Sequence, residues 1–229
     1  MKRLFATIAF VSVAYGAFAI GVSAGIGGSI SALSYNEGMS GTLFGATDSA
    51  SYTLTQMPLE AKVFLDATYV QLSAGYLIAN GGYQHTTQTG GLSFLTGNTY
   101  NDSYLTFSGL LKFPLGVGPM SFFPLIGAEY DYNLTLTDAS GNNLKPLLTS
   151  QQLSDLNQLW LKGGAGVDLS FGRFFLRPEL LAGFKLPSAT DNSEVTAIEN
   201  YVYSSGYSNA SGTVIWWTWD FNLLFGYRF

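Results

Sequence analysis

The 229-residue chain has no cysteine, few charged residues and no long apolar run beyond its first residues. Without cysteine, disulfides and cysteine-ligated metal sites are excluded. Charged residues are 11% of the chain, against about 25% in typical soluble domains. Hydrophobic residues make up 47%, yet after residue 20 no segment approaches the ~18–20 apolar residues that a membrane-spanning helix needs. A chain this apolar without such a helix indicates a membrane-embedded β-barrel.

The charge balance and the shortage of metal ligands exclude further classes. A net charge of −5 argues against a nucleic-acid partner, because phosphate binding requires clustered lysine and arginine. A single histidine and no cysteine leave only oxygen ligands for a metal. Asp191, Glu194 and Glu199 could hold Ca²⁺ loosely, but they lack the spacing of an EF-hand loop. A solvated acidic loop is the preferred interpretation, and we expect neither a metal nor a cofactor.

The first 19 residues are typical of a secretory signal peptide, which leaves a mature domain of residues 20–229. Lys2 and Arg3 form a basic start, residues 4–14 are apolar, and Ala17-Phe18-Ala19 is a small-residue cleavage site. Cleavage after Ala19 is therefore predicted. The alternative, an uncleaved N-terminal helix, is disfavoured because the apolar run is short.

The mature chain alternates β-patterned apolar runs with polar loops. A side-chain period of two predicts an all-β fold of eight antiparallel strands. These are residues 20–34, 59–66, 69–81, 103–115, 122–136, 158–170, 174–186 and 213–229. Short connections alternate with long ones, at residues 35–58, 82–102, 137–157 and 187–212, as in outer-membrane barrels with short periplasmic turns and long extracellular loops. Ten strands remain an alternative if residues 42–44 and 51–55 of the first long loop form an extra hairpin.

The charged residues of the predicted strands all fall on one face. They are the acids Glu60, Asp66, Glu129, Asp131, Asp168, Glu179 and Asp220, and the bases Lys62, Lys112, Lys162, Arg177, Lys185 and Arg228. The opposite face is apolar. A soluble barrel would have an apolar interior, whereas a charge facing lipid costs ~2–4 kcal/mol at the membrane midplane. The charges therefore predict an up-and-down transmembrane barrel with a polar lumen.

The lumen of an eight-stranded barrel is just wide enough for side chains to fill. Seven acids and six bases nearly balance, which favours a paired, chiefly structural ion network over a wide pore. Inward-facing glycines, among them Gly75 and Gly183, would make room for the long charged side chains. A gate or narrow conduit built from these pairs is the alternative.

The last strand ends in the aromatic residues Phe225, Tyr227 and Phe229 in steps of two. This pattern resembles the C-terminal signature that outer-membrane proteins present to the barrel-assembly machinery. In strand count, loop alternation and terminal phenylalanine, the chain resembles small eight-stranded bacterial outer-membrane barrels of the OmpA transmembrane domain, OmpX and OmpW type. Residues 64–70, 111–114 and 177–181 are similar to small outer-membrane β-barrel proteins of spirochaetes. The resemblance implies an outer-membrane location, contact with its lipids and use of that machinery, but no specific function.

The loops hold the remaining candidates for chemistry. His85, with a serine and Asp102, could serve a lipid-modifying enzyme, but a lone histidine without fixed partner spacing is a weak signal, and we expect no enzyme. The loop charges are eight acids and one base, so the outer surface should be acidic: Glu37, Asp48, Asp102, Asp138, Lys145, Asp155, Asp191, Glu194 and Glu199. Tyr201, Tyr203 and Tyr207, set among Ser, Asn and Gly, are typical of adaptable binding surfaces but also of aromatics at a membrane rim.

Three functions remain, in order of preference. The first is a structural or surface-interaction barrel, expected to be monomeric, with a closed lumen and a possible ligand at its loops. The second is a small porin-like channel for small solutes. The third is an outer-membrane lipid-modifying enzyme, which the single histidine disfavours.

Overall fold

The computed structural model describes residues 21–43, 46–89, 92–117, 120–187 and 208–229. The predicted signal peptide lies outside these residues, and its cleavage stays a prediction. No helix in the described ranges is long and apolar enough to cross a membrane.

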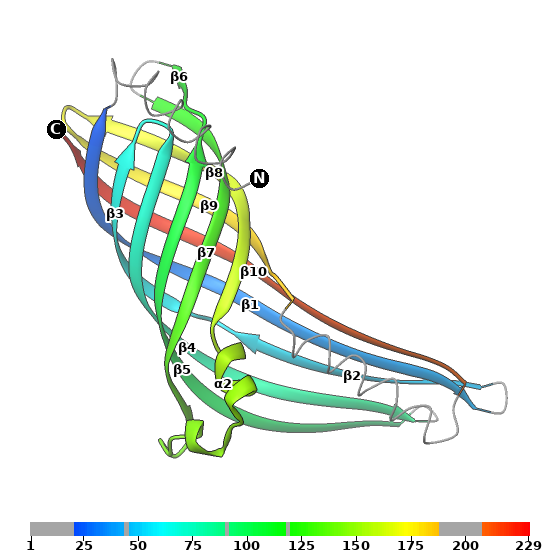
Figure 1. Ribbon diagram of the computed structural model, residues 1–229. Coiled ribbons are helices and arrows are strands. Elements are labelled where there is room, and N and C mark those ends of the chain that lie inside the picture. Colours follow the sequence, from blue (N-terminus) through cyan, green and yellow to red (C-terminus); the bar gives the residue numbers. More distant parts are fainter. Residues whose placement is uncertain (1–20, 44–45, 90–91, 118–119, 188–207) are drawn as a thin grey trace, which may run out of the picture.

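The strands form one antiparallel sheet that closes on itself (Figure 1). They are β1 Val22–Leu43, β2 Ala46–Gln56, β3 Leu59–Ala67, β4 Val70–Thr89, β5 Leu92–Lys112, β6 Leu115–Val117, β7 Met120–Asp138, β8 Gln158–Phe171, β9 Phe174–Lys185 and β10 Ser208–Arg228. Closure comes from the pairing of β1 with β10, which runs from Ser23 opposite Arg228 to Thr42 opposite Ser208. The ring has eight strand positions, because β2 and β3 share one and the short β6 pairs only with β7.

A proline interrupts the strand position that β2 and β3 share. Both strands lie between β1 and β4, with β3 beside residues 22–30 of β1 and β2 beside residues 33–43. Met57 and Pro58 separate them, and proline has no N–H to donate to a sheet. The carbonyl of Pro58 still accepts from the backbone N–H of Ser31 at 2.9 Å. The extra hairpin therefore lengthens an existing position of the ring and does not add new strand positions to it.

The first two long connections are not loops, which corrects the sequence-based prediction. Residues 35–43 and 46–56 form the outer part of the β1–β2 hairpin, and residues 82–89 and 92–102 belong to β4 and β5. β9 pairs with β10 only as far as Trp217, and β7 pairs with β5 only as far as Tyr100. β1, β2, β4, β5 and β10 thus continue past the closed barrel as a curved sheet, seen at the lower right of Figure 1. We name it the projecting sheet.

The third long connection contains a 3-10 turn, Lys145–Leu147, and a short helix, α2, at Ser150–Asp155. The Asp138 carboxylate begins it by accepting from the backbone of Ser140 at 2.9 Å and of Asn142 at 2.9 Å. The side chain of Asn142 donates a further bond at 2.8 Å. These bonds, those from Asn142 foremost, lower the pKa of Asp138. The fourth connection lies mostly outside the described residues, although residues 208–212 belong to β10.

The connections at the opposite end of the barrel are short, as predicted. β8 and β9 are joined by Gly172 and Arg173 between the pair Phe171 and Phe174. Gly172 has a φ of 67°, a left-handed conformation that glycine adopts without steric cost. The chain therefore turns within two residues here.

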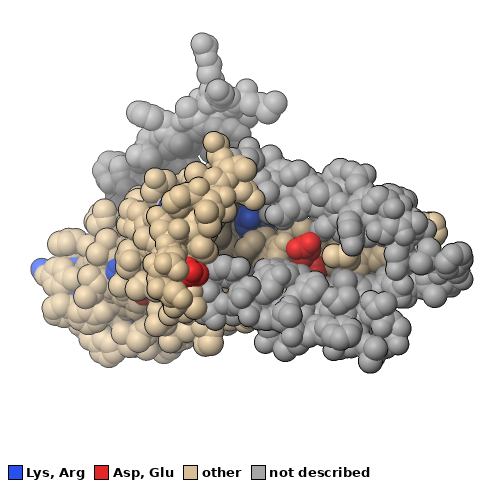
Figure 2. All heavy atoms as spheres, turned by 90° about the horizontal axis from the view of Figure 1, so that it is seen from below, with Lys and Arg blue, Asp and Glu red and all other residues tan. Residues whose placement is uncertain are grey.

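The closed barrel carries its apolar side chains on the outside. Each strand position contributes large apolar residues that are exposed on the outer face, such as Ile26, Val63, Leu72, Phe107, Ile126, Leu161, Leu180 and Phe221. We name this surface the apolar belt. Among the side chains of β5 that the structure describes, those of the belt begin at Leu105, and Asp102 lies beyond the belt. Viewed from the projecting end, the described surface shows few charges, and its basic and acidic atoms lie mainly in a hollow (Figure 2).

Candidate functional site

The thirteen charged residues predicted to face the lumen all lie inside the barrel. Twelve of them have an exposed fraction of at most 8%. Arg228 is the exception, with 38% of its side chain exposed near the end of the last strand. The burial of these twelve side chains agrees with the inward direction that the period of two predicts.

Five of these charges and one amide form an inner cluster, near the short turns. Its members are Asp66, Gln71, Lys112, Asp168, Arg177 and Arg228. Arg177 binds both Asp66 and Asp168, with a 3.0 Å bond from Nη2 to Asp168 Oδ2. Its Nη1 donates to Gln71 Oε1 at 2.6 Å. Lys112 donates to both oxygens of Asp66 at 2.6 and 2.7 Å, and Arg228 reaches Asp168 at 3.2 Å.

Aromatic rings enclose the Arg177 guanidinium. Its Cζ lies 5.6, 5.0 and 4.8 Å from the ring centroids of Phe64, Phe123 and Phe175. A cation over an aromatic face is stabilised by about 0.5–2 kcal/mol, the more so when water is excluded. Arg177 is only 1% exposed, so the guanidinium, its acids and the rings together fill the inner part of the lumen.

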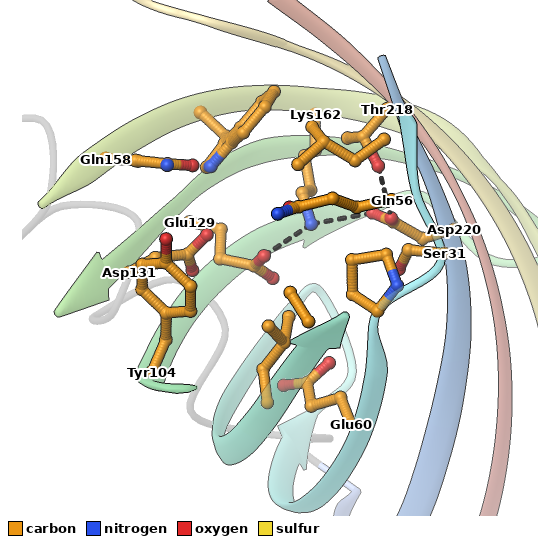
Figure 3. Close-up of a pocket in the computed structure, with 15 residues that line it drawn as sticks. Ser31, Gln56, Glu60, Tyr104, Glu129, Asp131, Gln158, Lys162, Thr218 and Asp220 are labelled. Atoms are coloured by element: carbon orange, nitrogen blue, oxygen red, sulfur yellow. Dashed lines mark hydrogen bonds and ion pairs between the residues drawn. The ribbon is translucent and has the colours of Figure 1, made fainter. Parts of the chain in front are cut away.

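A central cluster lies farther along the barrel. It contains Glu60, Lys62, Glu129, Asp131, Lys162, Glu179 and Asp220. Lys162 pairs with both Glu129 and Asp220, the latter at 2.6 Å (Figure 3). Lys62 pairs with Glu60 at 2.6 Å. Asn222 bridges two members by accepting from Lys62 at 3.2 Å and donating to Glu179 at 3.0 Å.

Neutral hydroxyls complete the central cluster. Glu60 accepts from Ser29 at 2.9 Å and from Thr106 at 2.5 Å, and Asp220 accepts from Thr218 at 2.8 Å. Gly75 and Gly183 leave space for the charged side chains, as predicted. A Cβ at Gly75 would lie 2.2 Å from Glu60 Oε1, and a Cβ at Gly183 would lie 3.0 Å from Lys162 Cγ. Side chains thus fill this level of the lumen from several strands at once.

The two clusters differ in charge. The inner cluster holds three bases and two acids, a balance of +1, and the central cluster holds two bases and five acids, a balance of −3. Lys185, stacked 4.6 Å over the Trp216 ring, adds the remaining positive charge nearer the outer end. The interior is therefore nearly neutral in total but acidic in its middle.

Asp102 lies inside the barrel mouth, which corrects its prediction as a loop acid of the outer surface. Its Oδ2 accepts weak bonds from Gln56 at 3.4 Å and Tyr104 at 3.5 Å. Its Oδ1 has no hydrogen-bond partner among the described residues. Burial, opposed by these two bonds and by the charge of Lys145, raises the pKa of Asp102 from 3.8 to about 6.

Sequence reasoning missed the inward-facing aromatics and Gln71. The rings of Phe64, Phe123 and Phe175 point inward although each neighbours an outward apolar residue. The alternation of side chains along a strand could have identified these rings, because residues an even number apart share a face. Phe175 lies two residues before Arg177, and Phe123 lies six residues before Glu129.

Three further predictions concern groups of residues. The strand register places His85 opposite Thr96 and Asp102 opposite Ala79, so His85 and Asp102 lie on the order of 20 Å apart along the sheet. Asp191, Glu194, Glu199, Tyr201, Tyr203 and Tyr207 lie outside the described residues. Phe225 and Phe229 face outward, and Tyr227 lies between them with its ring 5.5 Å from that of Phe229.

Comparisons with known proteins identify no family. No protein-family model and no curated protein sequence matches the chain. Among solved structures, the translocator domain of autotransporter NalP from Neisseria meningitidis is similar with a TM-score of 0.26 and 10% identity, over 89% of this chain and 88% of that chain. At that TM-score the likeness shows neither a shared family nor a shared function.

Proposed function

We propose that the chain is an integral protein of a bacterial outer membrane, with a closed lumen and a structural or surface-interaction role. The observation that carries the proposal is the distribution of side chains in one closed sheet. Large apolar side chains cover the outside while buried ion pairs fill the inside. In water this arrangement would expose the apolar belt and bury charges, whereas in lipid both faces meet a suitable environment.

The height of the belt fits a bilayer. On β7 the outward apolar side chains run from Phe122 to Leu134, which is about 40 Å along a strand at ~3.3 Å per residue. A strand tilt of ~45° reduces this to about 28 Å, close to the ~25 Å apolar band of outer-membrane barrels. The short turns would then face the periplasm and the projecting sheet would face outward.

Tryptophan fluorescence in vesicles of brominated lipid tests this proposal. Trp219 is half exposed on the belt, and Trp160 is buried inside the barrel. Two variants, each keeping one of these tryptophans and replacing the other three by phenylalanine, form a matched pair. Bromine on the acyl chains should quench Trp219 strongly and Trp160 weakly. Equal, weak quenching of both would contradict membrane insertion.

The projecting sheet is the proposed surface for interaction. Its outer strands lack further partners among the described residues, at β5 beyond Tyr100 and at β10 beyond Trp217. Such open strand edges accept extended peptide segments in known recognition modes. We propose a non-enzymatic role, since the register does not bring His85 and Asp102 together.

A small channel is the second candidate, favoured by one observation. A cavity of about 30 Å³ lies beside the central cluster, and rearranged ion pairs would have to open it further. Single-channel conductance of the refolded protein in a planar bilayer decides between the two. A silent barrel whose Lys162→Ala and Glu129→Ala variants lose only thermal stability supports the closed lumen. Steady, ion-selective openings that change in these variants support the channel.

A further inference from the structure

A small cavity lies between the central cluster and the outer end of the barrel. We name it the outer cavity; the residues drawn in Figure 3 line it, among them Gln56, Tyr104, Asp131, Gln158 and Lys162. Its volume is about 30 Å³, enough for one or two water-sized occupants, since a water requires roughly 10–15 Å³ on this measure. It is too small for an organic ligand.

One carboxylate that lines the outer cavity has an oxygen without a hydrogen-bond partner. Asp131 is 6% exposed, and its Oδ1 has no hydrogen-bond partner among the described residues. Figure 3 shows its carboxyl beside Tyr104 and Glu129. A buried carboxylate oxygen that makes no hydrogen bond is costly, so an occupant of the cavity is expected to compensate it.

The charged side chains around the outer cavity indicate which charge that occupant carries. Four acids line it, namely Glu60, Glu129, Asp131 and Asp220, against the single base Lys162. Lys162 is already engaged by Glu129 and Asp220, and Lys62 neutralises Glu60. Four acids against these two bases leave a balance of −2 at this level. A water would satisfy hydrogen bonds there but not the charge.

We propose that the outer cavity binds one small monovalent cation, such as Na⁺ or K⁺, at the Asp131 carboxylate. The neutral oxygens of Tyr104, Gln56 and Gln158 line the same cavity and are suitable further ligands. Tightly held divalent cations in proteins take several carboxylates together. Within the described ranges, no group of three acidic or histidine side chains is placed to hold a metal ion. A monovalent cation therefore fits the ligand set better than Ca²⁺ or Mg²⁺.

Thermal unfolding of the refolded full chain tests the proposal, because a ligand that binds only the folded state raises its Tm. The protein is titrated with NaCl or KCl, with N-methylglucamine chloride holding the ionic strength constant. We expect a saturating rise in Tm of a few degrees with Na⁺ or K⁺. Broadening of the sodium NMR signal by the wild-type protein provides direct evidence of binding.

Two variants locate the site. Asp131→Asn keeps the shape of the side chain, and it should abolish both the cation-dependent rise and the sodium broadening. Asp138→Asn, which removes the same charge from the last residue of β7, should keep both. If Asp131→Asn does not refold, Tyr104→Phe, which removes a neutral ligand, should weaken the apparent cation affinity several-fold.

Three outcomes would overturn the proposal. An identical Tm in all the salts would mean that a proton or a water, not a cation, occupies the outer cavity. Equal cation dependence in the wild type and in Asp131→Asn would place the effect elsewhere. A response to millimolar Ca²⁺ that Na⁺ and K⁺ cannot reproduce would contradict the choice of a monovalent ion.

Discussion

The Arg177 side chain joins residues from several strands in the interior of the barrel. It binds two carboxylates and Gln71, and it lies over three aromatic rings. Arg177→Met keeps the length of the side chain but leaves Asp66 and Asp168 short of a buried partner. Removing one member of a buried ion pair costs about 3–5 kcal/mol. Urea unfolding in vesicles should show that loss, whereas Arg173→Met at an exposed turn should change little. A loss no larger than that of Arg173→Met would mean that Lys112 and Arg228 suffice to neutralise both acids.

The raised pKa of Asp102 should make the stability of the fold depend on pH. Because its pKa is raised from 3.8 to about 6 in the fold, the folded state holds this proton more tightly than the unfolded state. The contribution of Asp102 to stability is therefore highest below pH 3.8 and falls as the pH rises to about 6. At pH 7, Asp102→Asn should stabilise the protein by on the order of 2 kcal/mol.

The Tm difference between Asp102→Asn and the wild type is the quantity to measure, since other acids titrate in the same range. It should be positive at neutral pH and vanish near pH 4. The exposed variant Asp138→Asn is the control and should show no stabilisation at neutral pH. A difference that does not change with pH would mean that Asp102 keeps its ordinary pKa.

At the scale of elements, two adjacent glycines of β8 offer an internal comparison. A Cβ at Gly164 would lie 2.0 Å from the backbone oxygen of Leu180 on β9, whereas a Cβ at Gly163 would meet its nearest atom at an ordinary 3.6 Å. Gly164→Ala should therefore force β8 and β9 apart and cost about 1–3 kcal/mol. Gly163→Ala should be nearly neutral. Equal unfolding midpoints in urea for the two variants would contradict this reading of the close contact.

The strand ends show why sequence reasoning succeeded inside the barrel and failed beyond it. Within the closed part, an apolar outer face and a charged inner face make the period of two visible in the sequence, and twelve of the thirteen charges are buried. The strands of the projecting sheet are rich in Ser, Thr, Asn, Gln and Gly, so no alternation of apolar and polar residues marks a strand in the sequence. Residues such as Thr53 and Thr55 still pair in register because the barrel aligns the strands that lead into the sheet.

For the whole molecule, the sequence was sufficient to predict closure and the polarity of the two faces but not how the lumen closes. Charge placement depends on strand parity alone, which is a local property. The grouping into an inner and a central cluster depends on which strands lie opposite each other across the lumen, as where Arg177 of β9 meets Gln71 of β4. The same holds for the aromatic rings around Arg177, which come from three different strands.

The effect of a lysine on the apolar belt should depend on whether water or lipid surrounds the barrel. Ile126 lies near the middle of the belt on β7 and Leu134 at its outer edge, and both are exposed in the isolated chain. In water, a lysine at either position would be close to neutral. In a bilayer, Ile126→Lys should cost ~2–4 kcal/mol and Leu134→Lys about 0–1 kcal/mol, because the penalty falls with distance from the midplane. Reversible urea unfolding in phospholipid vesicles measures both losses. Two equally small losses would mean that the outer face of the barrel does not meet lipid.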